Sequence, residues 1–459
     1  MHEDEIYRTS SQYRLWSFTA TSLQSIRANT NAVAAERVRA AIRRAKQQAR
    51  GQQTATPEGG TPNAGEDGKE NAVGNGNGNG DEIIECLTPE EELELVRYYC
   101  EKTMELGDAY QPALSTAVRT TAIQYLRRFY LTNSPMTYHP KSIMPCALFL
   151  ATKTENYYMS LRSFAEHIPN STPEDIIAPE FLLTQGLRFT FDVRHPFRSL
   201  EGGIMELNAI ARGEGAPGPH HVDEQTSEGL RERILALSPN PNQTKPTGGS
   251  ITSRIGIAHD NTRQILRSAA QLTDVYFLYT PSQIWLAALL LADRPLAEFY
   301  LDTKLGPVIP TSTSSSSSSS PASQALTSLR NKLTTTLTAC ADTLSTYQKT
   351  HTDATAPATM KNLKRIGKKL YHCQNPEKMD LIGLNRAAKR EGNGCGSGSG
   401  TPMGMAGVGV GATDDAELQR AAKKRKLERE RAEREGERIF GGELGRPRGG
   451  VALFHFQHL

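Results

Sequence analysis

The feature that most constrains the fold is a nearly unbroken apolar stretch that ends abruptly in opposite charges. Residues 138–155 read YHPKSIMPCALFLATKTE, and their apolar side chains cover most of the circumference of a helix. A helix of this kind is buried on several sides, so it belongs at the centre of a bundle. Its last turn carries Lys153, and a later segment, PEFLLTQGLRF, opens a second helix on Glu180. Opposite charges at the rim of two otherwise apolar helices predict a docking site for another protein.

The neighbouring residues also follow helical rather than strand spacing. The sequence Thr88-Pro89-Glu90-Glu91 is typical of a helix start, because it combines a hydroxyl cap, a proline and acidic residues in the first turn. Further helices are expected at 114–131, after Pro140, at 160–168 and from residue 172, the last interrupted at Pro179. Five helices with short connections and no strand-like alternation predict an all-α fold.

Pro145 leaves the start of the central helix open. A proline in the interior of a helix costs about 3 kcal/mol, whereas a proline in the first turn is tolerated. The sequence therefore does not fix where this helix begins.

The second half of the chain repeats the apolar pattern of the first half, with every matched pair offset by 141 residues. The matched residues are Pro140, Ile143, Ala147, Leu148, Leu150 and Ala151 in the first half and Pro281, Ile284, Ala288, Leu289, Leu291 and Ala292 in the second. Residues shared by many helices could produce such matches, but we favour a duplicated domain.

Composition separates these two helical repeats from segments rich in Gly, Ser, Asn and Pro, which predict disorder. The predicted boundaries are 1–50 for an N-terminal segment and helix, 51–85 for a disordered linker, 86–195 for the first repeat, 196–350 for the second repeat, 357–391 for a C-terminal helical segment and 392–459 for a disordered, charged tail. Disordered insertions are expected within the second repeat near 211–250 and 308–322.

Charge and motifs exclude several classes of function. The net charge is only +3, so the whole chain is not a polyanion-binding protein. The longest apolar run, Ile284–Ala292, is about half the length of a membrane span, and no apolar segment follows Met1. We therefore expect an intracellular protein without membrane contact, whose six cysteines, none in a CxxC pair, are reduced. No nucleotide-binding, protease, hydrolase or kinase motif is present, so we expect no catalysis, no cofactor and no metal.

Lys153 and Glu180 are expected to form a polar clamp beside an apolar groove. A lysine suits the end of a helix, where the dipole is negative, and a charged clamp can fix the register of a docked helix. The expected groove residues are Phe149, Leu150, Leu183 and Leu187. The alternative is that both charges are ordinary surface residues, which is the default for any single Lys or Glu.

These residues resemble the cyclin family. YHPKSIMPCALFLATKTE is similar to the third helix of the cyclin box, a five-helix domain that binds and activates a protein kinase. Lys153 falls where the family keeps its kinase-binding lysine, and Glu180 falls where it keeps its kinase-binding glutamate. Two segments outside the box, SSQYRLWSF at 10–18 and KKLYHCQNPEKMDLI at 368–382, resemble the cyclin H type. The resemblance implies two tandem cyclin-box repeats flanked by terminal helices.

The resemblance also implies a function and its partners. A cyclin of this type is the non-catalytic regulatory subunit of the cyclin-dependent-kinase-activating kinase. That kinase belongs to the transcription factor TFIIH, phosphorylates the C-terminal repeats of RNA polymerase II and other cyclin-dependent kinases, and acts in the nucleus. The implied partners are therefore a cyclin-dependent kinase, a RING-finger assembly subunit and the TFIIH core, with no direct nucleic-acid binding.

Two predictions concern the termini. Trp16 and Phe18 are expected to anchor the N-terminal helix, since large aromatic side chains bury much apolar area. The run Lys423, Lys424, Arg425 and Lys426 is a candidate nuclear-import signal, and a solvated charged helix is the alternative.

Three other functions stay open, of which the third, an enzyme, would need a polar pocket. The first is a different transcription-type cyclin, against which residues 10–18 argue. The second is a cyclin-fold DNA-binding factor of the TFIIB type. That factor would need a basic face on the folded repeats, whereas the basic residues of this chain cluster in its termini.

Overall fold

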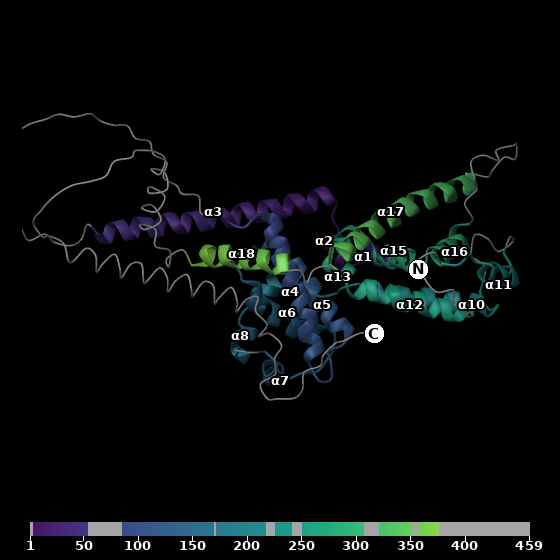
Figure 1. Cartoon of the computed structure of the whole chain (residues 1–459), viewed down its shortest axis with the longest axis horizontal. Helices are drawn as coiled ribbons and strands as arrows, with labels where there is room; N and C mark the ends of the chain where they lie inside the picture. Colours follow the sequence, from purple (N-terminus) through teal and green to yellow (C-terminus); the bar gives the residue numbers. More distant parts are fainter. Residues whose placement is uncertain are drawn as a thin grey trace, which may run out of the picture.

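The computed structural model describes the chain in seven ranges, and within them every regular element is a helix (Figure 1), which confirms the all-α fold. These ranges are 3–53, 85–168, 171–216, 225–240, 250–306, 321–351 and 357–375. Most of the predicted linker, parts of both insertions, the tail and the candidate import signal at 423–426 lie outside the described residues.

The first repeat is built around α6, as its apolar sequence predicts. Its helices are α4 (Pro89–Ala109), α5 (Thr116–Thr132), α6 (Pro140–Thr154), α7 (Leu161–Ala165), α8 (Pro173–Ile177) and α9 (Glu180–Gly186). Helix α6 packs against α4, α5, α8 and α9, and its residues from Ile143 to Thr152 are all buried. The interruption predicted at Pro179 is present, because this proline separates α8 from α9.

The start of α6, which the sequence leaves open, lies at Pro140. His139 caps the helix by accepting a hydrogen bond from the Lys141 amide through its ring nitrogen Nδ1 (3.0 Å). The helix then continues through Pro145, which is buried among its neighbours. Burial of the proline ring in the core offsets part of the cost of the helix hydrogen bond that a proline cannot donate.

The second repeat has the same plan. Its helices are α10 (Phe197–Ala211), α11 (Ser227–Leu235), α12 (Ile251–Arg267), α13 (Ala269–Leu272), α14 (Val275–Leu278), α15 (Pro281–Ala292), α16 (Arg294–Leu305) and α17 (Pro321–His351). Helix α15 begins at Pro281, the match of Pro140, and packs against α10, α12, α16 and α17. Two strongly apolar helices, α6 and α15, therefore occupy equivalent central places, which confirms the predicted duplication.

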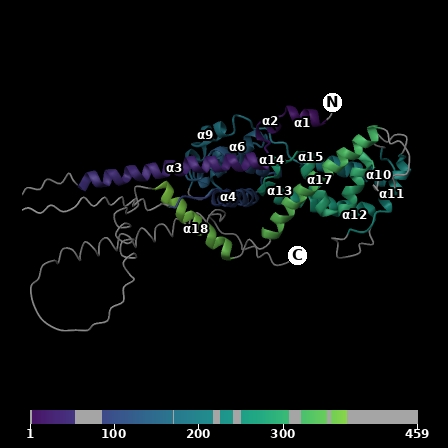
Figure 2. The same ribbon diagram turned by 90° about the horizontal axis from the view of Figure 1, so that it is seen from above.

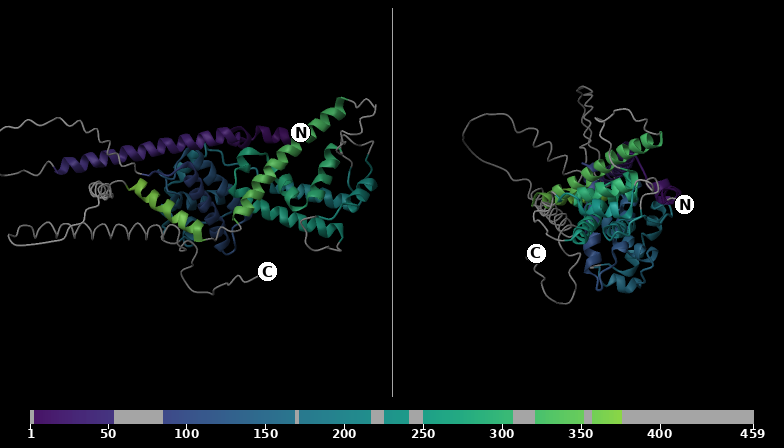
Figure 3. Two further views of the ribbon diagram at one scale, coloured as in Figure 1. Left: turned by 45° about the horizontal axis from the view of Figure 1, so that its top comes forward. Right: turned by 90° about the vertical axis from the view of Figure 1, so that its right-hand side faces the viewer.

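Two long terminal elements lie on the first repeat. Helix α3 (Ala20–Gln53) buries Ala34, Val38 and Ile42 in the core of that repeat, and α18 (Pro357–Gln374) buries Leu363, Ile366 and Leu370 in the same core. Figures 2 and 3 show α3 running along the first repeat and projecting beyond it. Packing on the first repeat thus covers the narrow apolar face of each helix, and an isolated helix of this kind would not be stable without such packing.

Trp16 holds the N-terminal segment in place. It ends α2 (Ser11–Trp16), which follows α1 (Glu3–Thr9), and its side chain is 1% exposed. The indole Nε1–H donates to the Thr190 hydroxyl (2.9 Å), and the guanidinium groups of Arg128 and Arg188 each lie 5.2 Å from the ring centre. Phe18 packs edge-to-face on Phe277 (6.0 Å between ring centres). Trp16 and Phe18 therefore have the packing that an anchor requires.

A partly buried ion cluster joins α3 to both repeats. Asp274, in the turn before α14 of the second repeat, accepts hydrogen bonds from Arg27 of α3 (2.7 Å to each oxygen) and Arg127 of α5 (2.6 Å). Burial alone would raise the pKa of the Asp274 carboxyl, but the two arginines outweigh burial and lower this pKa to about 2. The cluster fixes the N-terminal helix at the junction of the two repeats.

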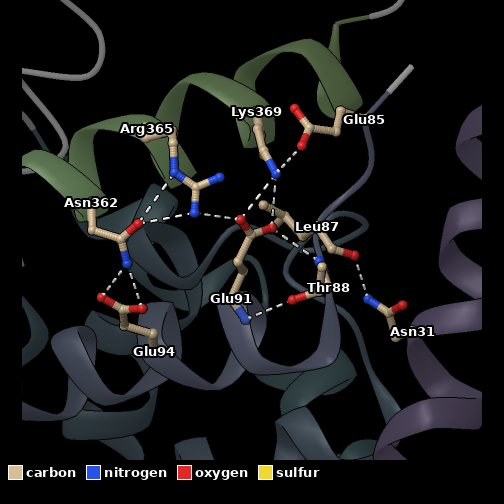
Figure 4. Close-up of polar contacts among 9 residues, drawn as sticks. All are labelled: Asn31, Glu85, Leu87, Thr88, Glu91, Glu94, Asn362, Arg365 and Lys369. Carbon is tan, nitrogen blue, oxygen red and sulfur yellow. Dashed lines mark hydrogen bonds and ion pairs between the residues drawn. The ribbon is translucent and has the colours of Figure 1, made fainter. Parts of the chain in front are cut away.

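A second polar cluster holds α18 on α4 (Figure 4). Lys369 of α18 pairs with Glu91 (3.0 Å) of α4 and with Glu85 (2.8 Å), and Arg365 also pairs with Glu91 (2.8 Å). Asn362 donates to both carboxylate oxygens of Glu94 (2.9 and 2.8 Å). Burial would raise the pKa of the Glu91 carboxyl, but the hydrogen bond from Lys369 and the other contacts lower it. We call these contacts the α18 clamp.

The start of α4 lies directly beneath this clamp and offers a local test. Thr88 and Glu91 form a reciprocal capping box, in which the Thr88 hydroxyl accepts from the Glu91 amide (3.2 Å) and the Glu91 carboxylate accepts from the Thr88 amide (3.1 Å). We expect Thr88→Ala to lower the free energy of unfolding by about 1 kcal/mol, because one helix amide loses its acceptor. Urea unfolding followed by circular dichroism measures this change. The matched control is Thr335→Ala on the exposed face of α17, and an equal loss in both variants would contradict the capping argument.

Candidate docking surface

Lys153 and Glu180 meet at one edge of the first repeat, as the sequence predicts. Lys153 lies in the last turn of α6, and Glu180 is the first residue of α9, which packs beside α6. The Lys153 Nζ atom lies 2.8 Å from Glu180 Oε1 and 2.7 Å from Oε2. The side chains are 40% and 25% exposed, respectively, so a partner can reach both of them.

Local structure fixes the end of α6. Glu155 caps the helix, and its carboxylate accepts a hydrogen bond from the Thr121 hydroxyl of α5 (2.6 Å). Asn156 then adopts a left-handed backbone (φ 54°), which asparagine tolerates better than most residues, and the Tyr157 amide returns to the Thr152 carbonyl (2.8 Å). These contacts direct the last turn of α6, and Lys153 with it, toward α9.

Close packing fixes the position of α9. At Gly186 a Cβ atom would lie 2.5 Å from the Phe129 ring of α5, so only glycine permits this approach. Arg188 and Phe189 follow with left-handed backbones (φ 52° and 53°), a conformation that costs energy in residues other than glycine. Trp16 contacts this strained turn through Arg188 and Thr190, so the N-terminal anchor also supports the docking edge.

The ion pair itself contributes little to the fold. Partly exposed pairs typically stabilise a protein by about 0.2–1 kcal/mol. The Lys153 Nζ atom also lies 4.8 Å from the centre of the Phe149 ring. Since the fold does not depend on this pair, its arrangement is available for recognition of a partner.

The prediction of which residues line the apolar groove is wrong. Phe149 and Leu150 are 5% exposed and Leu183 and Leu187 are 0% exposed, because all four residues lie in the core of the first repeat. The exposed apolar residues nearest in sequence to the pair are instead Tyr158, Ile177, Phe181 and Phe189, of which Tyr158 is 96% and Phe181 68% exposed. We call Lys153, Glu180, Tyr158 and Phe181 the docking rim. The helical period of α9 could have indicated Phe181, because Leu183 and Leu187 follow the inward stripe and Phe181 does not.

A cavity of about 980 Å³ lies between the two repeats. His195 lines it, but the imidazole is hydrogen-bonded on both sides, to the Thr121 hydroxyl (2.9 Å) and to the Tyr276 hydroxyl (2.9 Å). Burial lowers the pKa of His195 to about 3, so the ring stays neutral at physiological pH. Its hydrogen bonds and burial give His195 a structural role at the junction between the repeats.

Within the described part of the chain, no group of three or more histidine, cysteine or acidic residues is placed to hold a metal ion. Among the helices described, none is long and apolar enough to cross a bilayer.

Comparison with known proteins identifies the class. The family model of the cyclin C-terminal domain matches residues 195–345, which cover most of the second repeat. Cyclin CCL1 of Saccharomyces cerevisiae is 31% identical over 306 residues, a match that covers 66% of this chain and 62% of the yeast protein. Cyclin-H of Xenopus laevis is 34% identical over 130 residues, covering 27% of this chain and 40% of the frog protein.

A solved structure gives the same result. A chain in the structure of the CAK complex from Chaetomium thermophilum bound to ATP-gamma-S has 31% sequence identity and a TM-score of 0.57. The match covers 88% of this chain and all of the other. The chain described here belongs to the cyclin family. Relatives within that family include cyclin CCL1 and cyclin-H, which favours the cyclin H type over the other functions that the sequence leaves open.

Proposed function

We propose that this chain is the regulatory cyclin of a cyclin-dependent-kinase-activating kinase. The observation that carries the proposal is the exposed Lys153–Glu180 pair, which the sequence resemblance assigns to kinase binding and which is close in sequence to the exposed Tyr158 and Phe181. Similarity to a chain of the CAK complex supports the same role. In this role the chain performs no chemistry of its own.

The proposed mechanism is a shift between two states of the kinase. A protein kinase is active only when a glutamate on its mobile helix pairs with a lysine of its sheet. A cyclin that binds the state with this helix swung inward makes that state dominant. We infer that Lys153 and Glu180 bind polar groups of the mobile helix and its adjoining loop, and that Phe181 and Tyr158 cover apolar residues beside them.

The other partners rest on the family. We infer a nuclear protein that joins a RING-finger assembly subunit and the TFIIH core, so that its kinase phosphorylates RNA polymerase II repeats and other cyclin-dependent kinases. The part of the α3 helix that projects beyond the first repeat offers surface for such further contacts. We propose no direct contact with nucleic acid or membrane.

Exchanging the two charges tests the proposal. The double variant Lys153→Glu, Glu180→Lys keeps an ion pair within the chain but presents each charge at the other's position. We expect the affinity for the co-purifying kinase to fall about 30-fold or more, because like charges that face each other across an interface cost about 2–5 kcal/mol. Biolayer interferometry with the purified kinase measures the affinity, and circular dichroism checks the fold.

A matched pair of the same charge types provides the control. Lys304 and Glu206 form a comparable exposed pair on the second repeat (2.9 Å), and their exchange should leave the affinity unchanged. Unchanged kinase binding in the Lys153/Glu180 variant would contradict the docking assignment.

A further inference from the structure

Two cysteines meet where α18 crosses the segment that leads into α4. Cys86 is half-buried in that segment, and Cys373 is 4% exposed in the last turn of α18. Cys373 belongs to the core of the first repeat and Cys86 packs against that core, where the two thiols interact. The Cys86 thiol also donates to the Ala35 carbonyl of α3 (4.0 Å), and the Cys373 sulfur accepts a hydrogen bond from the Leu87 amide. Neither cysteine has a role in the docking rim.

The α18 clamp fixes this meeting point independently. Glu85, directly before Cys86, pairs with Lys369 (2.8 Å), which is four residues before Cys373 and therefore one turn earlier on the same face of α18. On the other side, the Leu87 carbonyl accepts a hydrogen bond from Asn31 of α3 (2.8 Å; Figure 4). The residues before and after Cys86 are thus tied to two different helices, which holds Cys86 between α3 and α18.

The two thiols differ in chemistry from the other cysteines described. The hydrogen bond with Cys373 and the positive charge of Arg39 outweigh burial and lower the pKa of Cys86 to about 7. The same hydrogen bond, together with burial, raises the pKa of Cys373. By contrast, burial raises the pKa of Cys100, Cys146 and Cys340 to about 12. A thiolate that reaches solvent is the form that reacts with oxidants, so Cys86 is the reactive member.

We propose that Cys86 and Cys373 are a hydroperoxide-reactive pair that closes into a disulfide between the start of α4 and the end of α18. The Cys86 thiolate attacks the terminal oxygen of the hydroperoxide, the O–O bond breaks, and the other oxygen leaves as an alcohol or water after taking a proton. Cys373 then attacks the sulfenic acid sulfur, the S–O bond breaks, and water leaves with the thiol proton. Two thiols thereby lose two electrons, which reduce one hydroperoxide. The product fixes α18 covalently on the first repeat.

Peptide mapping of the full-length protein tests the pair. The protein is treated with hydrogen peroxide at pH 7 and then denatured in the presence of N-ethylmaleimide, which blocks the remaining free thiols. It is digested without reductant and examined by mass spectrometry. We expect a peptide that joins Cys86 to Cys373 and disappears after dithiothreitol, while Cys100, Cys146 and Cys340 are recovered as maleimide adducts. Absence of the joined peptide, or joining of either cysteine to Cys395 instead, overturns the proposal.

Single substitutions test the order of the steps. Cys373→Ser removes the resolving thiol, so a dimedone adduct should accumulate on Cys86. Cys340→Ser, a control away from the pair, should leave disulfide formation unchanged. In the unmodified protein, Cys86 should react with iodoacetamide at pH 7 at least about tenfold faster than Cys340. Equal rates at the two positions, or a Cys373→Ser protein that forms no adduct on Cys86, would refute the assignment of Cys86 as the attacking residue.

Discussion

Replacing Asp274 with asparagine should lower the free energy of unfolding by about 3 kcal/mol, the low end of the range for removing one partner of a buried ion pair, because Asp274 is itself 26% exposed. The Arg127 side chain is 5% exposed and would keep its charge without a carboxylate beside it. Arg27, whose side chain is 17% exposed, would lose both of its hydrogen bonds to Asp274. Urea unfolding at pH 7, followed by circular dichroism, measures the loss.

The same variant should change the acid sensitivity of the protein. The folded-state pKa of Asp274 is about 2, below its ordinary value of about 4. The stability that this carboxylate contributes is therefore present above pH 4 and lost as the pH falls toward 2. The asparagine variant should lack this part of the pH dependence.

An exposed pair provides the control for this prediction. Asp192 pairs with Arg194, and both side chains are about half exposed (49% and 48%). Asp192→Asn should therefore change stability by no more than about 0.5 kcal/mol. If Asp274→Asn costs no more than Asp192→Asn, the cluster does not hold α3 to the repeats.

Trp16→Ala should cost a similar amount, about 3–5 kcal/mol, because it empties a large, fully buried site. The substitution also removes the hydrogen bond to Thr190 and the ring contacts with Arg128 and Arg188. Tyr13→Ala is the matched control, since Tyr13 is an aromatic residue of the same helix but 41% exposed. Equal losses in thermal unfolding would show that Trp16 is no anchor.

Trp16 also connects stability with docking. It contacts the strained turn after α9 at Arg188 and Thr190, and α9 carries Glu180. We therefore expect Trp16→Ala to weaken kinase binding even at temperatures where the repeats remain folded. Tyr13→Ala should bind the kinase as the unmodified protein does.

The features of the fold that the sequence predicts are those set by residues close together in the chain. The capping box at Thr88, the prolines at 140 and 281 that open the two central helices, and the break at Pro179 each act within one turn of a helix. Lys153 and Glu180 could be paired because the resemblance to cyclins places them at equivalent positions of a known helix arrangement. Each of these predictions required only the residues nearby or the family pattern.

Features that depend on tertiary packing could not be predicted in this way. Asp274 is far along the chain from Arg27 and Arg127, and no sequence pattern identifies this aspartate as the partner of the two arginines. Burial of Leu183 and Leu187 depends on which face of α9 meets the core, so assigning both to an open groove was wrong. Cys86 and Cys373 likewise meet only because α18 folds back over the start of α4.

The most direct test of the account is activation of the kinase that co-purifies with the full-length chain. The purified kinase subunit is titrated with the cyclin, and phosphate transfer to a peptide of RNA polymerase II repeats is measured. We expect activity to rise to saturation with the unmodified chain and with the Lys304/Glu206 exchange variant. The Lys153/Glu180 exchange variant should require at least about 30-fold more protein for half-maximal activity. Failure of the unmodified chain to activate the kinase, or equal activation by both exchange variants, would contradict the account.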